Sequence, residues 1–439
     1  MERQLIALED EILKQLEGKF TTIVDPTRRL ELVTSVAKTI NPKISTEEIK
    51  QIMDDINDFS PISELLVDED IEDIMVNNTE NVFVYSTKDG KKKMEGKSIP
   101  DREMLGRFVG KMKLYATNQT SNGNILDVHM PSGSRANIVA SPLGYDITVR
   151  NFKPKPLSVI DLINNNTMDY NMAARLWLYV DGLKVRPANL LFGGMPAAGK
   201  TTLLNSMFSF LRPETRIVTI EETYELDTST QENCVRLETS EDMPMEALVK
   251  NALRMRPDMI IIGEVRGAEA NDMITAMNIG KIAMGTIHAS TTREIINRLE
   301  HTPMNVPQDI IPVIDALLII SMVYKNGKPF RKITQMSEIS GIETQVLLSD
   351  IYKYDYKTQE GSAILPSVTY RDMISKVIGV PPPDILAEER VRALVLQKLN
   401  SLGKRDIRSI SEAVRGYYDN PDQMLRSIGL SDIQPVIRI

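Results

Sequence analysis

The stretch Gly194-Met195-Pro196-Ala197-Ala198-Gly199-Lys200-Thr201 fits the pattern G-x-x-x-x-G-K-[ST]. An apolar run at 188–193 precedes it and predicts a buried strand, and residues 202–208 follow it with the pattern of a helix. A strand–loop–helix context is what this motif requires. The alternative, a chance glycine-rich turn, does not explain these flanks. The sequence therefore predicts a loop that binds the phosphates of a nucleoside triphosphate.

Each position of this loop has an expected task. Glycine lets the backbone turn tightly, so that N–H groups and the start of the helix point at the β- and γ-phosphates. Lys200 is expected to place a positive charge there, and the Thr201 hydroxyl is expected to bind Mg²⁺. The expected nucleotide-binding residues of the loop are Gly194, Met195, Pro196, Ala197, Ala198, Gly199, Lys200, Thr201 and Thr202.

Length and composition limit the kind of protein. A chain of 439 residues predicts two to three domains, and a net charge of −8 argues against a general nucleic-acid binder. Cys234 is the only cysteine, which excludes an internal disulfide and fits a reducing compartment. The apolar runs fall well short of the roughly 18 residues of a membrane span. We therefore expect a cytoplasmic protein that reaches a membrane only through a partner.

The first 152 residues divide into two predicted segments. Residues 1–60 carry apolar residues at helical spacing, and Ser45-Thr46-Glu47-Glu48 is a capping box that predicts the start of a third helix. We expect this segment to be a helical packing or docking bundle without chemistry. Residues 61–152 mix short strands with one helix, predicted at 103–116, and this mixture indicates a compact α+β domain.

Residues 153–360 alternate between strands and helices. Strands are predicted at 215–220, 259–263 and 283–287, with a helix near 269–279 between the last two. This alternation indicates an α/β fold, a mostly parallel sheet with helices on both faces. Ligands of such sheets bind beyond the carboxyl ends of the strands.

Three segments flank this predicted core. A linker around Pro154 and Pro156 leads into it from the α+β domain. Residues 315–356 predict an antiparallel meander that closes it, with Asn326-Gly327 as one of the turns. Residues 361–439 return to helical patterns and predict a C-terminal helical extension.

An acid stands at the end of the strand where a Walker B motif belongs. Ile260-Ile261-Ile262 runs into Gly263 and Glu264, so Glu264 takes over from the aspartate that usually ends such a strand. Asp258 begins the strand, at the wrong end for a metal. Glu264 is expected to orient the attacking water, or to bind Mg²⁺ through water. The alternative is an acid that only caps a strand.

Two further groups follow other predicted strands. Glu221 and Glu222 open an acidic stretch, and paired carboxylates suit a site that also holds a divalent cation. Glu222 is therefore the other candidate for the metal's shell, and the alternative is a solvated acidic loop. His288 ends a third strand and is a candidate sensor of the γ-phosphate, although a lone histidine at such a place is usually structural.

Arginines supply the remaining candidate charges. Phosphoryl transfer needs positive charge beyond Lys200 and Mg²⁺, and a planar guanidinium supplies it. Most arginines are surface residues, so each one alone is a weak candidate. The arginines considered are Arg135, Arg150, Arg254, Arg256 and Arg266.

In order and spacing, these motifs resemble those of the type II/IV secretion ATPases. The matching stretches are the phosphate loop, the acidic stretch at 220–226, the segment 254–267 that contains Glu264, and the segment 285–289 that contains His288. Residues 133–137 and 147–152 resemble the branch that contains Tad-pilus and archaeal filament-assembly ATPases. The helical ending resembles an extension of the archaeal members.

The resemblance implies a particular architecture and partners. It implies a RecA-like core that binds and hydrolyses ATP, a preceding PAS-like domain, and a homohexameric ring. It also implies that arginines of the N-terminal domain reach the nucleotide, and we assign Arg150 to catalysis and Arg135 to binding. Arg266, in the predicted core, is also assigned to binding. Expected partners are a polytopic inner-membrane platform protein and, indirectly, pilin-like subunits, with no direct nucleic-acid contact. The protein would then lie at the inner face of the cell membrane.

Two positions depart from the family pattern. Glu222 replaces the usual aspartate of the acidic motif, which is a conservative change. Lys281 stands where the first of two histidines is usual, while His288 keeps its place.

The sequence thus predicts a Mg²⁺-ATP-hydrolysing motor for a type IV pilus-like filament or a related secretion machine. The residues expected to act in catalysis are Glu264, Lys200, His288, Glu222 and Arg150, and those expected to support binding outside the loop are Arg135, Glu221 and Arg266. The alternatives are a VirB11-like type IV secretion ATPase, and a regulator that binds ATP with little turnover.

Overall fold

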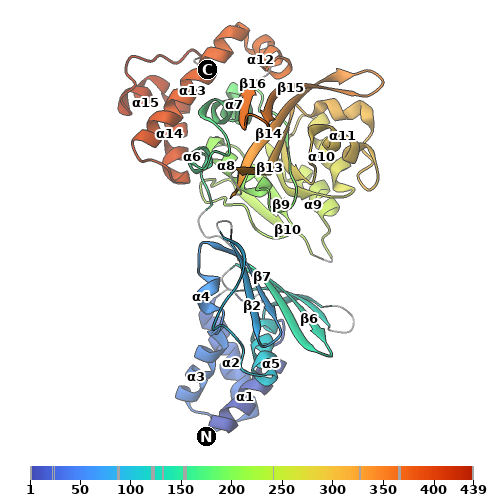
Figure 1. Ribbon diagram of the computed structural model, residues 1–439, viewed down its shortest axis with the longest axis vertical. Coiled ribbons are helices and arrows are strands. Elements are labelled where there is room, and N and C mark those ends of the chain that lie inside the picture. The colour runs from blue at the N-terminus through green and yellow to red at the C-terminus, as the bar shows by residue number, and fades with distance from the viewer. Residues whose placement is uncertain are drawn as a thin grey trace. The chain divides into compact units, whose positions relative to one another are not determined.

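The chain forms two compact units, Met1–Pro154 and Lys155–Ile439, which are described separately (Figure 1). The predicted linker residue Pro154 and the predicted turn Asn326-Gly327 lie outside the described part of the chain, and the four-segment division stays a prediction. The computed structural model describes residues 2–21, 23, 25–86, 89–119, 124–130, 133–151, 156–240, 242–325, 328–363 and 367–437.

The N-terminal unit combines helices with a seven-stranded antiparallel sheet in the order β3-β2-β1-β7-β6-β5-β4. This arrangement confirms the predicted α+β class. The elements are α1 (Glu2–Gln15), α2 (Pro26–Ile40), α3 (Thr46–Asn57), α4 (Ser63–Leu66), β1 (Ile71–Asn77), β2 (Asn81–Ser86), β3 (Gly90–Lys93), α5 (Arg102–Lys113), β4 (Ala116–Gln119), β5 (Ile125–His129), β6 (Arg135–Ser141) and β7 (Gly144–Arg150).

The first three helices share one hydrophobic core with this sheet. Ile12 of α1 and Ile52 of α3 are fully buried in the same cluster as Phe108 of α5 and Val149 of β7. The predicted capping box forms: the Ser45 hydroxyl accepts from the backbone N–H of Glu48, whose side chain accepts from the backbone N–H of Ser45. The N-terminal helices are therefore packed elements of this unit.

The second unit is built on a nine-stranded sheet in the order β10-β9-β11-β12-β8-β13-β14-β15-β16. Strands from β10 to β13 are parallel, as predicted, and β13 to β16 form the predicted antiparallel extension. The strands are β8 (Leu190–Gly193), β9 (Ile217–Glu221), β10 (Cys234–Glu238), β11 (Met259–Val265), β12 (Ile282–Ile287), β13 (Ala316–Lys325), β14 (Lys328–Ile342), β15 (Val346–Asp355) and β16 (Glu360–Ala363).

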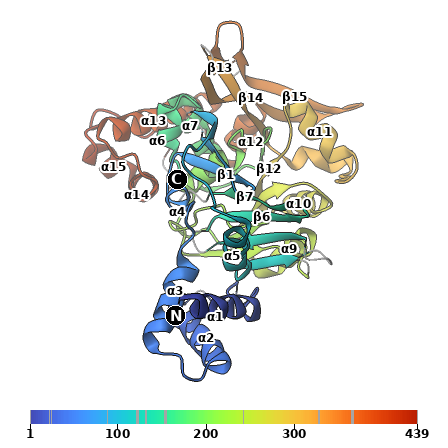
Figure 2. The same ribbon diagram turned by 60° about the horizontal axis from the view of Figure 1, so that its bottom comes forward.

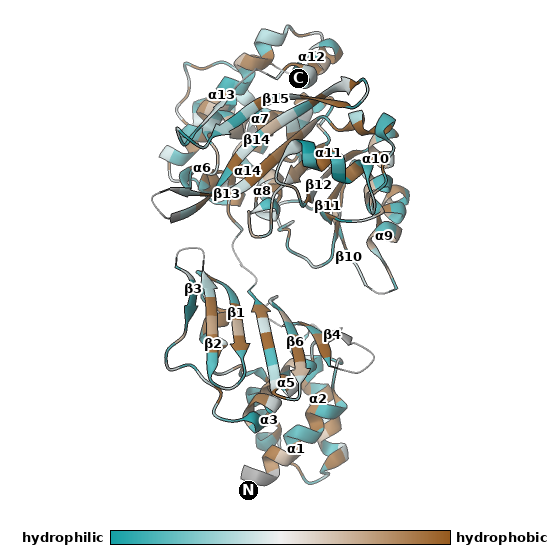
Figure 3. Ribbon diagram, turned by 45° about the vertical axis from the view of Figure 1, so that its right-hand side comes forward, coloured by the Kyte–Doolittle hydropathy of each residue, from teal (hydrophilic) through white to brown (hydrophobic). Residues whose placement is uncertain are grey.

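Helices cover both faces of this sheet, because alternate residues of its strands point to opposite sides. Leu190 and Phe192 pack into one core with α6, α7, α8 and the C-terminal helices, whereas Leu191 packs into a second core with α9, α10 and α11. Figure 3 shows the strands of this sheet carrying long hydrophobic stretches. The helices are α6 (Val159–Asn164), α7 (Tyr170–Asp181), α8 (Lys200–Ser206), α9 (Met245–Ala252), α10 (Glu269–Asn278) and α11 (Thr292–Glu300).

The C-terminal helices pack beside α6 and α7 in both ribbon views (Figures 1 and 2). They follow the antiparallel extension and belong to the same hydrophobic core as the first face of the sheet. These helices are α12 (Thr369–Ile378), α13 (Pro382–Ser401), α14 (Ile407–Asp419) and α15 (Pro421–Ser427).

The strand order carries the signature of the predicted RecA-like core. The strand before the phosphate loop, β8, and the strand that carries Glu264, β11, are not neighbours, because β12 lies between them. The α/β fold class predicted from the sequence is therefore confirmed.

Some elements differ from the prediction. The helix expected to reach residue 116 ends at Lys113, and Ala116 begins strand β4. The short strand β10 (Cys234–Glu238) was not predicted; it comprises five half-buried residues at an edge of the sheet. Among the helices that the structure describes, none combines the length and the apolar character needed to cross a membrane.

Candidate nucleotide-binding site

The predicted phosphate loop connects β8 to α8, as the motif requires. A Cβ atom on Gly194 would lie 2.6 Å from the Ile320 carbonyl oxygen and 3.0 Å from Lys200 Cγ, so no other residue fits there. Gly199 adopts a φ of +97°, which favours glycine. Thr201 and Thr202, both half-buried, follow Lys200 in the first turn of α8. The loop is thus shaped by backbone constraints that only its glycines satisfy.

The exposed tip of the loop is held by an arginine that the sequence analysis missed. Met195, Pro196 and Ala197 are exposed, and Ala197 has a φ of +60°, an unusual conformation for alanine. Arg331 of β14 donates its Nε–H to the Ala197 carbonyl at 3.0 Å. Ala198, next along the loop, is buried. This contact fixes the strained residue from a strand more than a hundred positions away in the sequence.

Glu264 lies in a β-bulge that aims its side chain at the loop. The register between β11 and β12 shifts between Ile262 and Val265, and the Thr286 hydroxyl donates to the Gly263 carbonyl at 2.7 Å beside this shift. A Cβ atom on Gly263 would lie 3.2 Å from Glu221 Cγ. A side chain at position 263 would therefore crowd Glu221. This contact explains why glycine stands at the position where a Walker B strand usually has an aspartate.

Three cationic or imidazole groups surround the Glu264 carboxylate. His288 Nε2 lies 2.6 Å from Glu264 Oε1, and Lys200 Nζ lies 3.9 Å from the same oxygen. Arg266 Nη2 lies 2.5 Å from Glu264 Oε2. The structure thus brings together residues from the phosphate loop and from two predicted strand ends.

Arg266 also connects Glu264 to the acidic stretch. Its Nη1 donates to both carboxylate oxygens of Glu222, at 3.0 and 2.9 Å. The turn that presents it is fixed by Glu269, whose Oε1 accepts from the backbone N–H groups of Arg266 and Gly267. Arg266 therefore bridges the two acids that the sequence proposed for the metal shell. We call Lys200, Glu222, Glu264, Arg266 and His288 the loop-edge network.

Glu221 is buried and serves a different purpose from Glu222. One of its oxygens accepts from the backbone N–H groups of Glu225 and Leu226, at 2.7 and 2.9 Å, and the other lies 3.6 Å from Arg236 Nη2. Burial raises the pKa of Glu221, and these hydrogen bonds oppose that rise. Glu221 therefore shapes the acidic loop from within. The sequence analysis did not identify Arg236, because no local pattern marks it.

Burial shifts the pKa of two of the basic groups around Glu264, Lys200 and His288. It lowers the pKa of Lys200, and the charge of Glu264 opposes that change. Burial and the nearby positive charge of Lys200 lower the pKa of His288 below its ordinary value of 6.5. The lowered pKa of His288 favours the neutral ring, whose Nε2 lies beside Glu264 Oε1.

Lys281 and Asp258 lie at the opposite edge of the sheet. Both stand where strands begin, Asp258 before β11 and Lys281 before β12, whereas His288 follows the end of β12. A strand of this length places the two ends roughly 20 Å apart. Lys281 is therefore too distant to act on phosphates at the loop of the same chain. It lines a cavity of about 590 Å³ at this edge, together with Asp258.

Arg135 and Arg150 belong to the N-terminal unit and lie directly opposite each other on β6 and β7. The Arg150 side chain is largely exposed, and its Nε donates to Asp73 at 3.2 Å. Like charges on directly opposite residues of a sheet are unfavourable. Arg254 and Arg256 are exposed in the second unit, and no further role follows for them.

The donor atoms near the loop suit Mg²⁺. Among the described residues no group of three or more His, Cys, Asp or Glu side chains is arranged to hold a metal. The available protein donors, Thr201, Glu222 and Glu264, all offer oxygen. Mg²⁺ uses few protein oxygens and completes its shell with substrate phosphates and water. The residues present therefore fit Mg²⁺ that binds together with a triphosphate.

The sequence of the chain matches the profile of a known protein family. The sequence profile described as "Type II/IV secretion system protein" matches residues 55–324, more than half of the chain. The chain belongs to the type II/IV secretion system protein family. The predicted family is thereby confirmed.

Archaeal relatives are among the similar sequences of this family. The chain is similar to uncharacterized protein MJ0781 of Methanocaldococcus jannaschii, with 39% identity over 49% of this chain and 31% of the relative. It is also similar to uncharacterized protein MJ0900 of the same organism, with 31% identity over 67% of this chain and 56% of the relative. The chain thus spans about a third and just over half of the lengths of these two curated relatives.

A solved structure is also similar to this chain. The chain resembles the pilus retraction motor PilT with bound ADP, with 15% identity, a TM-score of 0.47, and coverage of 84% of this chain and 96% of that chain.

Proposed function

We propose that this protein is a Mg²⁺-dependent ATPase that works as a homohexameric motor of a type IV pilus-like filament or a related secretion machine. The observation that carries the proposal is the loop-edge network, in which a glutamate faces the lysine of the phosphate loop. Membership of the family supports a role in secretion or filament assembly, because its members are described as type II/IV secretion system proteins. The motor would act on a membrane platform protein, and through it on pilin-like subunits.

The proposed chemistry assigns one task to each group of the loop-edge network. Lys200 and the backbone N–H groups of the loop bind the β- and γ-phosphates. Lys200 and Arg266 both face Glu264, and a bound triphosphate offers these cations a stronger partner. Glu264 is then free to accept a proton from the attacking water, while neutral His288 keeps the carboxylate oriented. Thr201, with Glu222 or Glu264, would hold Mg²⁺, and the ion would neutralise negative charge on the phosphates.

Glu264→Gln tests the catalytic assignment. The amide keeps the shape but cannot accept a proton, so we expect ATP binding to persist and turnover to fall by about 10² or more. Phosphate release and calorimetric ATP binding measure the two effects. Lys200→Ala should instead abolish binding. Glu246→Gln, a change of an exposed acid on α9, is the matched control and should leave both unchanged. Wild-type turnover in Glu264→Gln would refute the assignment of Glu264.

The arginines of the N-terminal unit provide a second test. Arg150 and Arg135 lie opposite each other in the sheet, and two adjacent guanidinium groups suit a polyphosphate ligand. In the proposed ring, Arg150 acts on the nucleotide of a neighbouring subunit. Lys200→Ala and Arg150→Ala proteins, each inactive alone, should then regain activity when mixed under conditions of subunit exchange. A mixture that stays inactive places Arg150 on the nucleotide of its own chain, and full activity of Arg150→Ala alone excludes both versions.

The partner assignment is tested by fractionation. We expect the protein to lie in the cytoplasm and to sediment with membranes only when its platform protein is co-expressed. Co-purification of the platform and pilin-like proteins supports the filament motor. Co-purification of a coupling protein for transferred DNA would favour a VirB11-like secretion ATPase instead. ATP binding without phosphate release would favour a regulator with little turnover.

A further inference from the structure

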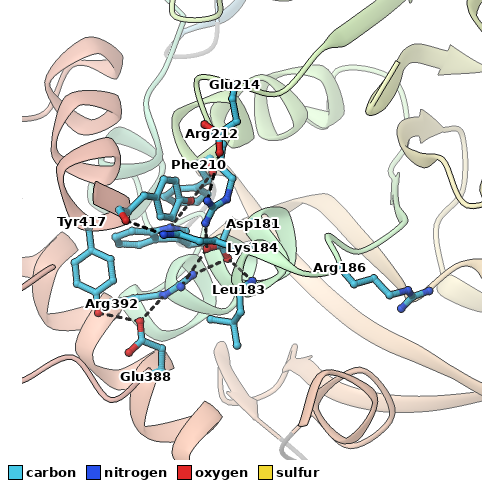
Figure 4. A network of polar contacts seen from close by, with 12 residues as sticks. Asp181, Leu183, Lys184, Arg186, Phe210, Arg212, Glu214, Glu388, Arg392 and Tyr417 are labelled. Carbon is cyan, nitrogen blue, oxygen red and sulfur yellow. Dashed lines mark hydrogen bonds and ion pairs between the residues drawn. The ribbon is translucent and has the colours of Figure 1, made fainter. Parts of the chain in front are cut away.

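The C-terminal helices contact the far end of the helix that carries the phosphate loop (Figure 4). Helix α8 begins at Lys200 and continues into the turn η2 (Met207–Phe210). The Tyr418 hydroxyl on α14 donates to the Phe210 carbonyl at 2.6 Å. The same hydroxyl accepts from the Trp177 indole N–H of α7 at 2.8 Å. One buried hydroxyl therefore ties α14 to both α7 and the phosphate-loop helix.

This junction is tightly packed and excludes water. Trp177 is fully buried, and its ring stacks on Phe210 with centroids 5.5 Å apart and planes 3° apart. Arg212, which follows η2, places its guanidinium 4.3 Å from the centre of the Tyr418 ring. Removal of the Tyr418 hydroxyl would leave a buried indole N–H and a buried carbonyl without a partner, which is costly. The position of η2 is therefore coupled to the position of α14.

Helix α14 is anchored independently of Tyr418. The neighbouring Tyr417 hydroxyl donates to Glu388 at 2.8 Å, and Arg392 donates to the same carboxylate at 3.1 Å. Arg392 also donates to both oxygens of Asp181, the last residue of α7, at 2.8 and 3.2 Å (Figure 4). We call Asp181, Glu388, Arg392 and Tyr417 the Arg392 network. It holds α14 against α13 and α7, and it meets the segment after η2 through Arg212, whose Nη2 lies 3.7 Å from Asp181 Oδ2.

A second contact reaches the loop after the acidic stretch. Arg415 of α14 donates to the Thr230 carbonyl, in the segment between β9 and β10. Next to it, Gln231 donates its side-chain N–H to the Phe208 carbonyl of η2 at 3.2 Å. Helix α14 thus contacts both segments that follow the nucleotide-facing motifs.

We propose that Tyr418 is a positioning residue for ATP binding. By fixing the end of the phosphate-loop helix against α7, it sets the orientation of Lys200 and Thr201 at the other end of that helix. This role rests on the proposed binding of ATP at the phosphate loop. The C-terminal helical extension is then a part of the nucleotide site, and any partner that displaces α14 weakens ATP binding.

The test is Tyr418→Phe, with Tyr417→Phe as the matched control. Both substitutions remove one buried tyrosine hydroxyl from the same helix, and both should lower the melting temperature. Only Tyr418→Phe should raise the Kd for Mg²⁺-ATP, by about fivefold, the scale of one hydrogen bond. Because the contact affects binding and not the reacting atoms, KM should rise by the same factor while kcat stays within about twofold of wild type. Calorimetry and phosphate release at a temperature well below both melting temperatures measure these values.

Several outcomes would overturn the proposal. An unchanged Kd in Tyr418→Phe excludes the role, as does an equal rise in Tyr417→Phe, which would mean general loosening of α14. If Tyr418→Phe does not fold, Arg415→Ala replaces it, with the largely exposed Arg408→Ala as control. Equal Kd values for those two proteins would also refute the proposal. Failure of the wild-type protein to bind ATP would instead refute the proposed function.

Discussion

Two networks of charged side chains lie in the second unit, and they are built in opposite ways. Arg392 is 3% exposed and bonds to carboxylates that are 1% exposed, whereas Arg266 is 54% exposed and its partners Glu222 and Glu264 are 45% and 20% exposed. The Arg392 network joins helices of the same core. The loop-edge network joins residues at or after the ends of four strands, β8, β9, β11 and β12. The first is enclosed by protein, and the second is open to solvent on one side.

This difference in burial distinguishes residues that stabilise the fold from residues that we propose act on the nucleotide. A buried ion pair that loses one partner leaves an uncompensated charge, so its members are held in one arrangement. An exposed ion pair contributes little to stability, so its members can exchange partners. We infer that the loop-edge charges are free to move from one another to a triphosphate, while the Arg392 network keeps the framework unchanged.

The largest effect on stability is expected from Arg392→Ala. The substitution leaves the buried Asp181 and Glu388 carboxylates without their cation, which should lower the free energy of unfolding by about 3–5 kcal/mol. Denaturant unfolding of the full chain measures this loss. Arg390→Ala, an exposed change on the same helix, is the control and should stay within about 0.5 kcal/mol of wild type. Equal losses in the two proteins would contradict the comparison.

Arg266→Ala should show the reverse pattern. Because its ion pairs are exposed, the free energy of unfolding should change by no more than about 1 kcal/mol. Turnover should fall by about 10², the scale of one lost group that stabilises transition-state charge. Measured together, phosphate release and denaturant unfolding separate the two effects. A protein that is destabilised in proportion to its lost activity would place Arg266 among the supporting residues.

The pH dependence of activity sharpens the assignment of His288. Burial and Lys200 lower the pKa of His288 below 6.5, so the ring is neutral above that pH and gains a proton only as the pH falls further. We expect kcat/KM to be constant between pH 8 and 6.5 and to decline below it. His288→Gln should lack this decline. A decline centred above pH 6.5 would show that the imidazolium, and not the neutral ring, is the active form.

A further effect is expected in the N-terminal unit, where a third group of charged side chains surrounds the buried Glu9. Burial and the neighbouring Asp55 raise the pKa of Glu9 from 4.5 to about 7, although Arg107 lies 2.7 Å away. The native carboxyl therefore holds its proton up to about pH 7, whereas the unfolded chain releases it near 4.5. Stability should decrease as the pH rises between these values.

Glu9→Gln should remove this loss. Amide hydrogen exchange of α1 and α3 in the full chain, corrected for the intrinsic exchange rate, measures it at pH 5 and pH 8. Glu11→Gln, an exposed change on the same helix, should keep the dependence of the wild type. An unchanged pH dependence in Glu9→Gln would exclude Glu9 as its source.

The sequence predicted those features that local patterns determine. The phosphate loop, the parallel strands and the capping box at Ser45 all depend on residues a few positions apart, and all are present. The sequence also predicted that Glu221, Glu264 and His288 lie at one edge of the sheet, because the carboxyl ends of parallel strands meet at the same edge.

Contacts between distant segments could not be predicted in the same way. Arg331 reaches Ala197 only because β13 and β14 pair next to β8, and the pairing of Arg266 with Glu222 depends on how two loops meet. Short edge strands such as β4 and β10 lack enough apolar residues for a pattern. Lys281 could not be placed from its motif alone, since its distance from the loop depends on the direction of β12.

Trp177 is the only tryptophan among 439 residues, and it lies where α7, the phosphate-loop helix and α14 meet. The tryptophan fluorescence of the whole protein, excited selectively over its tyrosines, therefore comes from one indole at one junction. Its emission responds to the loss of the Tyr418 hydrogen bond and to any shift of the stacked Phe210. We expect this indole to be an optical probe for the proposed nucleotide site, and stopped-flow measurements on unlabelled protein would test whether added ATP changes its emission.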